Sequence, residues 1–139
     1  MDRLLAAFRP RIQNAREFAL RQRVLLLWSK DDVAIDVALG ALPFEERCVI
    51  RASDWTIPPG VVLRTCCAED LVILKTFAGR PQDWIDIESV LVRQRRSIDW
   101  RLVFAELEPL LALRETPENL EKLKQLKSKI EKDAWKEDR

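Results

Sequence analysis

The sequence predicts an α+β fold: a small mixed β-sheet made of two hairpins, helices packed on it, and a helical C-terminus. Three observations support this prediction. The chain has 139 residues, 47% of them hydrophobic, which is enough for one core. Two pairs of short apolar runs are each joined by a turn, and the second half repeats apolar residues at helical spacing. We therefore expect one body over residues 1–113 and a charged amphipathic helix over residues 114–139.

The first third of the chain is expected to contain one helix and one hairpin. Pro10 fits the first turn of the helix, which has one apolar face. That face consists of Ile12, Ala15, Phe18 and Ala19. The apolar runs 24–28 and 33–40 flank a polar turn, a pattern that is typical of a β-hairpin.

The middle of the chain is expected to form a short helix and a second hairpin. Residues 42–53 contain a proline followed by acids, which suit the N-terminus of a helix. The runs 54–57 and 61–67 flank a Pro-Pro-Gly turn, in which proline restricts the backbone and glycine permits the reversal.

The rest of the chain is expected to be helical. Helices are predicted over residues 68–79, 81–93 and 99–114, and Gly79 is a typical residue to end the first of them. The last helix carries a narrow apolar stripe made of Leu120, Leu123, Leu126 and Ile130. Such a stripe packs either on the same chain or on another one.

Composition excludes several classes of function. The chain has 24 basic and 23 acidic residues, so it lacks the strong positive field of a protein that binds nucleic acid by bulk charge. Histidine is absent, which excludes histidine-dependent nucleophiles and zinc sites and leaves carboxylates and lysine, groups that suit Mg²⁺. The three cysteines match no disulfide or zinc spacing, and no apolar run is long enough to span a membrane. We expect a cytoplasmic protein with no membrane partner.

Charged residues gather in the segment 74–91. On the helix that starts at Pro81, Asp83 and Asp86 lie three residues apart and share a face, while Ile85 and Leu91 are expected to point toward the core. In one interpretation the acids are solvated and pair with the preceding basic residues, Lys75 and Arg80. In the other, the four charges form a functional cluster.

Asp36 also has two interpretations. It lies inside an apolar run, on the same face as Ala34 and Ala38 if that run is a strand. A carboxylate in such a place requires a hydrogen bond, a counter-ion or a bound cation, which makes Asp36 a candidate functional residue. The alternative is an aspartate on an edge strand that faces water.

Two segments of the chain resemble a known family. "IDVALGALPFEER", residues 35–47, and "AEDLVILKTFAGRPQDWIDIESVLVRQ", residues 68–94, look like the second half of the minimal nucleotidyltransferases of the AbiEii/AbiGii toxin type, in the DNA polymerase beta-like superfamily. The most specific features are a strand aspartate followed by L-G-A-L-P-F-E-E, and E-D-L-x-x-x-K followed by R-x-x-D-x-x-D.

The resemblance implies roles for five residues. Asp36 would be a catalytic carboxylate that binds Mg²⁺, and Lys75 and Arg80 would contact the triphosphate of a nucleotide. Asp83 would be a second catalytic acid that supports the lysine or the nucleophile, with Asp86 beside it. The implied activity of the complete form is the transfer of a nucleotide from a nucleoside triphosphate to a hydroxyl group of RNA or protein.

The chain departs from the family before this region. It has neither the glycine turn nor the D-x-D strand that supply the phosphate-binding turn and the first two metal carboxylates, so we expect it to be incomplete or inactive alone. A missing strand would leave an unpaired sheet edge, from which we expect a homo-oligomer or a complex with a partner protein.

Two alternatives to an enzyme stay open. The first is a non-catalytic interaction or regulatory module, as in a toxin-antitoxin pair. The second is a nucleic-acid binder that uses the basic segment 92–96 with Trp100 and Arg101 as a phosphate and stacking patch. Basic residues at the end of a helix also have a simpler explanation, because they compensate the helix dipole.

Overall fold

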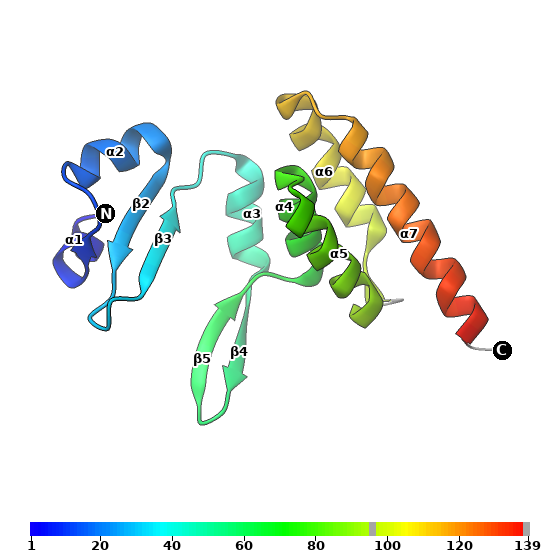
Figure 1. The fold of residues 1–139 in the computed structure, drawn as a ribbon, viewed down its shortest axis with the longest axis horizontal. Coiled ribbons are helices and arrows are strands. Elements are labelled where there is room, and N and C mark those ends of the chain that lie inside the picture. The colour runs from blue at the N-terminus through cyan, green and yellow to red at the C-terminus, as the bar shows by residue number, and fades with distance from the viewer. Residues whose placement is uncertain (95–96, 138–139) are drawn as a thin grey trace. The chain divides into compact units, whose positions relative to one another are not determined.

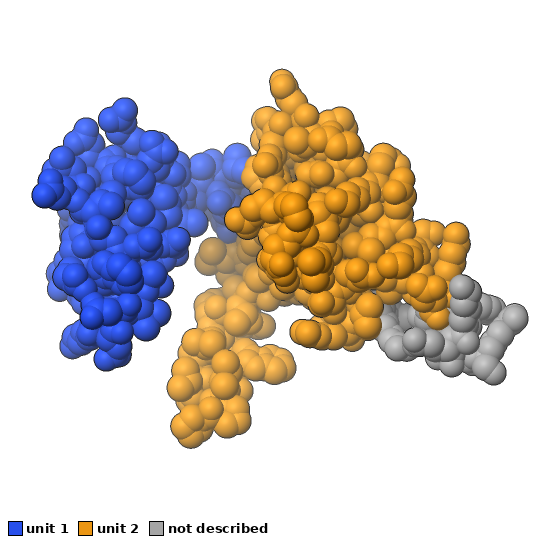
Figure 2. Space-filling view, in the orientation of Figure 1, with its two compact units in different colours: residues 1–46 blue, residues 47–139 orange. Residues whose placement is uncertain are grey.

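The computed structural model describes residues 1–94 and 97–137. It contains two compact units, Met1–Glu46 and Arg47–Arg139, which are shown as a ribbon in Figure 1 and in two colours in Figure 2. Each unit is described by itself below.

Unit 1 contains two short helices and a three-stranded antiparallel sheet. The elements are α1 (Asp2–Ala7), β1 (Arg9–Pro10), α2 (Ala15–Gln22), β2 (Val24–Trp28) and β3 (Ala34–Ala38). The sheet order is β1-β2-β3, and the predicted hairpin is β2 paired with β3. The expected place of Pro10 is wrong, because Pro10 pairs with Leu27 in the sheet and α2 starts five residues later.

The core of unit 1 lies between α2 and one face of the sheet. Its buried residues are Ala15, Ala19, Leu25 and Leu27. Alternation along β2 buries Leu25 and Leu27 and leaves Leu26 on the opposite face, as the period of a strand requires. The two buried residues of α2, Ala15 and Ala19, are both alanines.

Unit 2 contains a second hairpin and a group of four helices, with α3 (Pro43–Arg51) leading into it. The remaining elements are β4 (Ser53–Ile57), β5 (Val61–Thr65), α4 (Ala68–Ala78), α5 (Pro81–Gln94), α6 (Trp100–Arg114) and α7 (Glu118–Glu137). The two hairpins belong to separate sheets, and all the described strand pairs are antiparallel, so the expectation that both hairpins form one mixed sheet is wrong.

The core of unit 2 is made by its helices. α4 packs against α5 and α6, and α7 packs across α4, α5 and α6 (Figure 1). The largest fully buried apolar side chains of this core are Ile73, Ile87, Leu107, Leu111 and Leu123. The apolar stripe of the last helix is thus used within this chain, with Leu123 fully buried.

The α+β class predicted from the sequence is confirmed, with seven helices, a three-stranded antiparallel sheet, a separate hairpin and a helical C-terminal half in the described residues. Within residues 1–94 and 97–137, no helix has both the length and the apolar character needed to cross a membrane.

Candidate functional site

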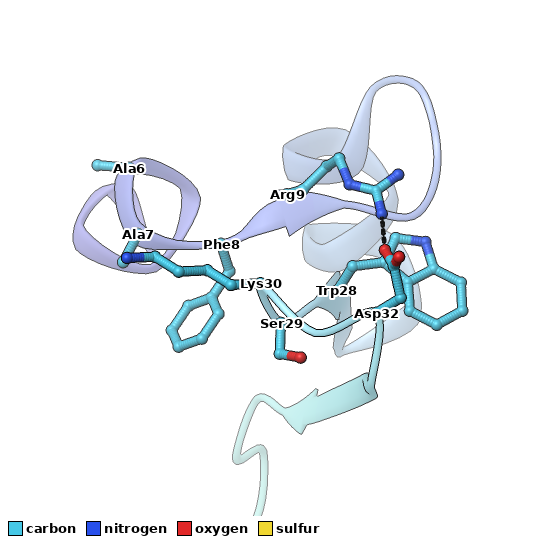
Figure 3. Close-up of a pocket in the computed structure, with 8 residues that line it drawn as sticks. All are labelled: Ala6, Ala7, Phe8, Arg9, Trp28, Ser29, Lys30 and Asp32. Atoms are coloured by element: carbon cyan, nitrogen blue, oxygen red, sulfur yellow. Dashed lines mark hydrogen bonds and ion pairs between the residues drawn. The ribbon is translucent and has the colours of Figure 1, made fainter.

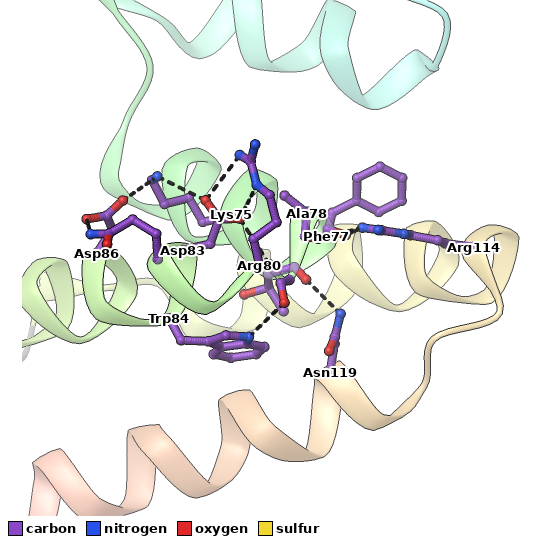
Figure 4. A network of polar contacts seen from close by, with 12 residues as sticks. Lys75, Phe77, Ala78, Arg80, Asp83, Trp84, Asp86, Arg114 and Asn119 are labelled. Carbon is purple, nitrogen blue, oxygen red and sulfur yellow. Dashed lines mark hydrogen bonds and ion pairs between the residues drawn. The ribbon is translucent and has the colours of Figure 1, made fainter.

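Four of the five candidate residues lie together in unit 2 (Figure 4). They are Lys75 on α4, Arg80 in the following turn, and Asp83 and Asp86 on α5. Helix α4 ends at Gly79, whose φ of 66° favours glycine and whose N–H donates to the carbonyl of Lys75. Pro81 then occupies the first turn of α5, where no amide donor is needed. This short turn brings the basic residues of α4 and the turn against the acids of α5.

Asp83 is the buried centre of the cluster, with a side chain that is 3% exposed. Its Oδ2 accepts hydrogen bonds from the backbone N–H of Arg80 at 3.1 Å and from Arg80 Nε at 2.8 Å. Its Oδ1 accepts from Lys75 Nζ at 3.2 Å and from Arg80 Nη2 at 3.3 Å. The bonds from Arg80, followed by that from Lys75, lower the pKa of Asp83 to about 2, so its carboxylate is ionised at neutral pH.

Lys75 bridges the two acids. Its Nζ donates to Asp86 Oδ2 at 2.6 Å as well as to Asp83. The bond to Asp86 is the main cause that raises the pKa of Lys75, and the same bond lowers the pKa of Asp86. Asp86 is far more exposed than Asp83, at 38% against 3% of the side chain. The ion pair of Lys75 with Asp83 is therefore buried on the Asp83 side, whereas the ion pair with Asp86 is accessible to water.

The buried face of α5 differs from the prediction. Ile85 is 59% exposed, so the expectation that it points toward the core is wrong, whereas Leu91 is buried as expected. Asp83, Ile87 and Leu91 follow one another at intervals of four residues and share one face of the helix. Asp83 lies at the N-terminal end of the buried face of α5, and its carboxylate is buried for this reason although it is in the first turn of the helix.

Asp36 belongs to unit 1 and is described separately. It lies on β3, the edge strand of the sheet, and faces the same side as Ala34 and Ala38. Its side chain is 64% exposed and forms an ion pair with Arg11. Of the two interpretations of Asp36, the edge-strand carboxylate that faces water fits the geometry of unit 1, and burial gives no support to a metal-binding role.

The donor set of the described residues does not fit a two-ion magnesium centre. In the described part of the chain, no group of three or more acidic, cysteine or histidine side chains is close enough to hold a metal ion. Asp83 and Asp86 are both engaged by Lys75, and Asp36 offers a single carboxylate. Mg²⁺ stays a prediction that comes from the resemblance.

A second charged network, which the sequence did not lead us to expect, connects α3, α4 and α6. Arg51 donates to both oxygens of Asp70, with the shortest bond at 2.6 Å, and to Glu106 Oε1 at 3.0 Å. Glu106 also accepts two bonds from Arg47, at 2.8 Å and 2.5 Å. Asp70 is fully buried. Arg47 and Arg51 lie four residues apart on α3, a spacing that indicates a common face and was the available signal.

The three cysteines lie near this network. Cys67 Sγ accepts from the backbone N–H of Asp70 at 3.4 Å and donates to its carboxylate at 3.2 Å. Burial is the main cause that raises the pKa of Cys48 to about 12 and the pKa of Cys67 to about 11, and it also raises the pKa of Cys66. These thiols are therefore protonated at neutral pH and are poor nucleophiles.

Unit 1 has an open pocket of about 330 Å³ beside the β2–β3 turn (Figure 3). It is lined by Ala6, Ala7, Phe8, Arg9, Trp28, Ser29, Lys30 and Asp32. Arg9 forms an ion pair with Asp32, and its guanidinium lies 6.0 Å from the centre of the Trp28 ring. None of the predicted site residues lines this pocket. Its Arg9 is already paired with Asp32, so we assign no ligand to the pocket.

The proposed nucleic-acid patch is only partly covered, because Arg95 and Arg96 lie outside the described residues. The indole of Trp100 stacks on the ring of Phe104 with centroids 5.6 Å apart, and Lys127 Nζ lies 5.2 Å from its centre. These contacts account for Trp100 by packing within α6 and against α7. They supply no argument for base stacking.

The cluster predicts a pH dependence of stability. The pKa of Asp83 is about 2 in the folded protein and 3.8 for the ordinary side chain. Because the folded pKa is the lower one, the stabilisation by this carboxylate is complete above the ordinary value and is lost as the pH falls toward about 2. We expect the Asp83→Asn variant to be less stable than the parent chain at neutral pH, with a difference that shrinks in this acid window. Urea unfolding measures it, and a difference that stays constant with pH would contradict the ion-pair role.

The described residues define an α+β protein whose helical unit carries a charged cluster on α4 and α5. Comparison with protein-family models, with curated proteins and with solved structures found no match to this chain. Arguments about function therefore depend on the contacts within the chain itself.

Proposed function

We propose that this chain is part of a nucleotidyltransferase, whose complete form transfers a nucleotide from a nucleoside triphosphate to a hydroxyl group of RNA or protein in the cytoplasm. One observation carries the proposal: the lysine of E-D-L-x-x-x-K and the arginine and two aspartates of R-x-x-D-x-x-D lie in a single cluster. In this proposal Lys75 contacts the triphosphate, Arg80 assists it, and Asp83 holds the lysine in position. The resemblance also implies a Mg²⁺-binding role for Asp36, which stays a separate prediction about unit 1.

The contacts of Lys75 support a role at a phosphate. An ammonium group has three donors, and the described acids take two of them. The side chain is 25% exposed, which leaves an approach for an anion. Arg80 is 75% exposed, so its guanidinium can also reach a phosphate in the same region. Lys75 and Arg80 both donate to the buried Asp83. Each of them can give up some of these hydrogen bonds and donate to phosphate oxygens instead.

The two acids have different expected effects in this proposal. Asp83 is buried and holds both cations, so its loss disorders the cluster. Asp86 is the exposed competitor for Lys75, because its bond of 2.6 Å occupies the side from which a phosphate would approach. Replacement of Asp86 should therefore increase the affinity for a triphosphate, while replacement of Lys75 should reduce it.

Calorimetric titration of the 139-residue chain with each nucleoside triphosphate, with and without Mg²⁺, tests the proposal. We expect binding that Lys75→Met weakens by about 10-fold or more and that Asp86→Asn strengthens. Lys129→Met is the matched control, because Lys129 pairs with Glu88 at 2.8 Å elsewhere on α5 and α7.

Two outcomes would overturn the assignment. Absence of any nucleotide binding would favour the non-catalytic interaction module. Equal effects of Lys75→Met and Lys129→Met would mean that the affinity reflects general charge and that the cluster is structural.

A further inference from the structure

The β4–β5 hairpin is an uncharged, uncovered element. No charged residue occurs between Asp54 and Arg64, so the segment 55–63, "WTIPPGVVL", is entirely neutral. Every residue of both strands is exposed. Natural edge strands usually carry charges, and lysine above all, that discourage pairing with other chains. These two strands lack such protection over most of their length.

The register gives the hairpin two different faces. Residues that are paired across an antiparallel ladder share a face, and so do residues two apart. One face therefore carries the apolar pairs Trp55–Leu63 and Ile57–Val61, with the polar pair Ser53–Thr65 at the base of the hairpin. The other carries Thr56–Val62 and the ion pair of Asp54 with Arg64 at 3.3 Å. The first face is apolar over its two outer pairs, and the second carries the charged pair.

Nothing in unit 2 covers the apolar face. Among the described residues, β4 and β5 pair with each other and with no other strand, and Figure 1 shows the hairpin extending away from the helices of its unit. The four apolar side chains are between 41% and 65% exposed. An isolated two-stranded hairpin is marginally stable in water, so this element gains stability when its apolar face is covered.

We propose that the hairpin face made of Trp55, Ile57, Val61 and Leu63 is the contact surface between two copies of this chain. Because the face has no charge, it offers nothing for a charged partner to recognise, and its complement must also be neutral and apolar. The same face on a second copy meets that requirement. A two-fold contact of this kind is self-complementary by construction.

The order of the cross-strand pairs along the hairpin suits a two-fold contact between two copies. The pair nearer the base of the hairpin, Trp55–Leu63, is large, and the pair nearer the turn, Ile57–Val61, is smaller. If two hairpins pack face to face in opposite directions, the large pair of each copy lies on the small pair of the other, as close packing requires.

The size of the face predicts how strong the dimer is. The four side chains expose roughly 400 Å² of surface, comparable to the largest apolar patch of a typical monomer. A standard stable interface buries about 800 Å² on each partner. The hairpin contact should therefore be weak, with monomers at low concentration and dimers at high concentration. It does not depend on nucleotide binding.

Sedimentation velocity of the 139-residue chain over a wide range of concentrations tests this proposal. The matched variants are Val61→Lys on the apolar face and Val62→Lys on the polar face, which introduce the same charge at adjacent residues that are 53% and 57% exposed. We expect the parent chain and Val62→Lys to dimerise with similar affinity. Val61→Lys should weaken the dimer by about 100-fold or abolish it, because it would bury a charge.

Each contrary outcome has a clear meaning. A parent chain that is monomeric at every concentration would overturn the proposal. A dimer that Val61→Lys does not weaken, or that both variants weaken equally, would place the contact elsewhere. Both valines are exposed, so neither substitution removes a core contact, and circular dichroism of the helices verifies the fold of each variant.

Discussion

Replacement of Arg51 by methionine should lower the free energy of unfolding by about 3–5 kcal/mol, the cost typical of breaking a buried ion pair from one side. Arg51 supplies the bonds that satisfy the Asp70 carboxylate, and Asp70 is fully buried. Without Arg51, this carboxylate would stay in the core, where the described residues still bonded to it are the neutral thiols of Cys48 and Cys67. Methionine keeps most of the volume of the arginine stem, so the effect reports the lost charge more than lost packing.

Arg47→Met is the control for this experiment. Arg47 lies one helical turn earlier and bonds to Glu106, but its side chain is 48% exposed, and Glu106 keeps a bond from Arg51. We expect a loss of about 1 kcal/mol for Arg47→Met. Urea unfolding of the two variants and the parent chain measures both values. Similar losses would show that the pairing of Asp70 contributes no more than that of an exposed salt bridge.

Replacement of Gly79 by alanine should destabilise the protein by about 2–3 kcal/mol, from two separate causes. The first is the backbone, since φ is 66° and a side chain disfavours this left-handed conformation. The second is space, because a Cβ atom would lie 2.5 Å from Asn119 Nδ2. Asn119 can rotate away only if it gives up its hydrogen bond of 3.1 Å to the carbonyl of Thr76.

Gly40→Ala provides the comparison. Gly40 does not have a positive φ, and the nearest atom to its added Cβ is 3.6 Å away, an ordinary contact. We expect a change within about 0.5 kcal/mol. Because Gly79 immediately precedes Arg80, Gly79→Ala should also weaken any binding that depends on the Lys75 cluster. Thermal unfolding of both variants measures the stability, and equal shifts would contradict the role of Gly79 as a helix terminus.

Most secondary structure was predictable from local patterns. Gly79 ends α4 and Pro81 starts α5 as expected, because caps depend on backbone chemistry that is local to a few residues. The misplacement of Pro10 has a long-range cause. Residues 9 and 10 form a strand by pairing with β2, and no local preference reveals a partner that is about 17 residues away.

The candidate site was predictable as a group of residue types and only partly as a geometry. The spacing of Asp83 and Asp86 on one helix indicated a common face, and Lys75 does meet both acids. The burial of Asp83 was not predictable, because it depends on which face of α5 the other helices cover. For Asp36 the sequence left two interpretations, and the edge position of β3 favours the exposed one within its unit.

The order of residues thus established the α+β class, the two hairpins, the junction between α4 and α5, and the absence of histidine chemistry, since periodicity, capping and composition are properties of the chain itself. Packing decided the rest. It buried Asp70 beside Arg51, closed Lys75 between two acids and left the apolar face of β4 and β5 uncovered within unit 2. Those outcomes depend on contacts between residues far apart in the chain, where the covered area and the low dielectric of the interior determine which charges must pair.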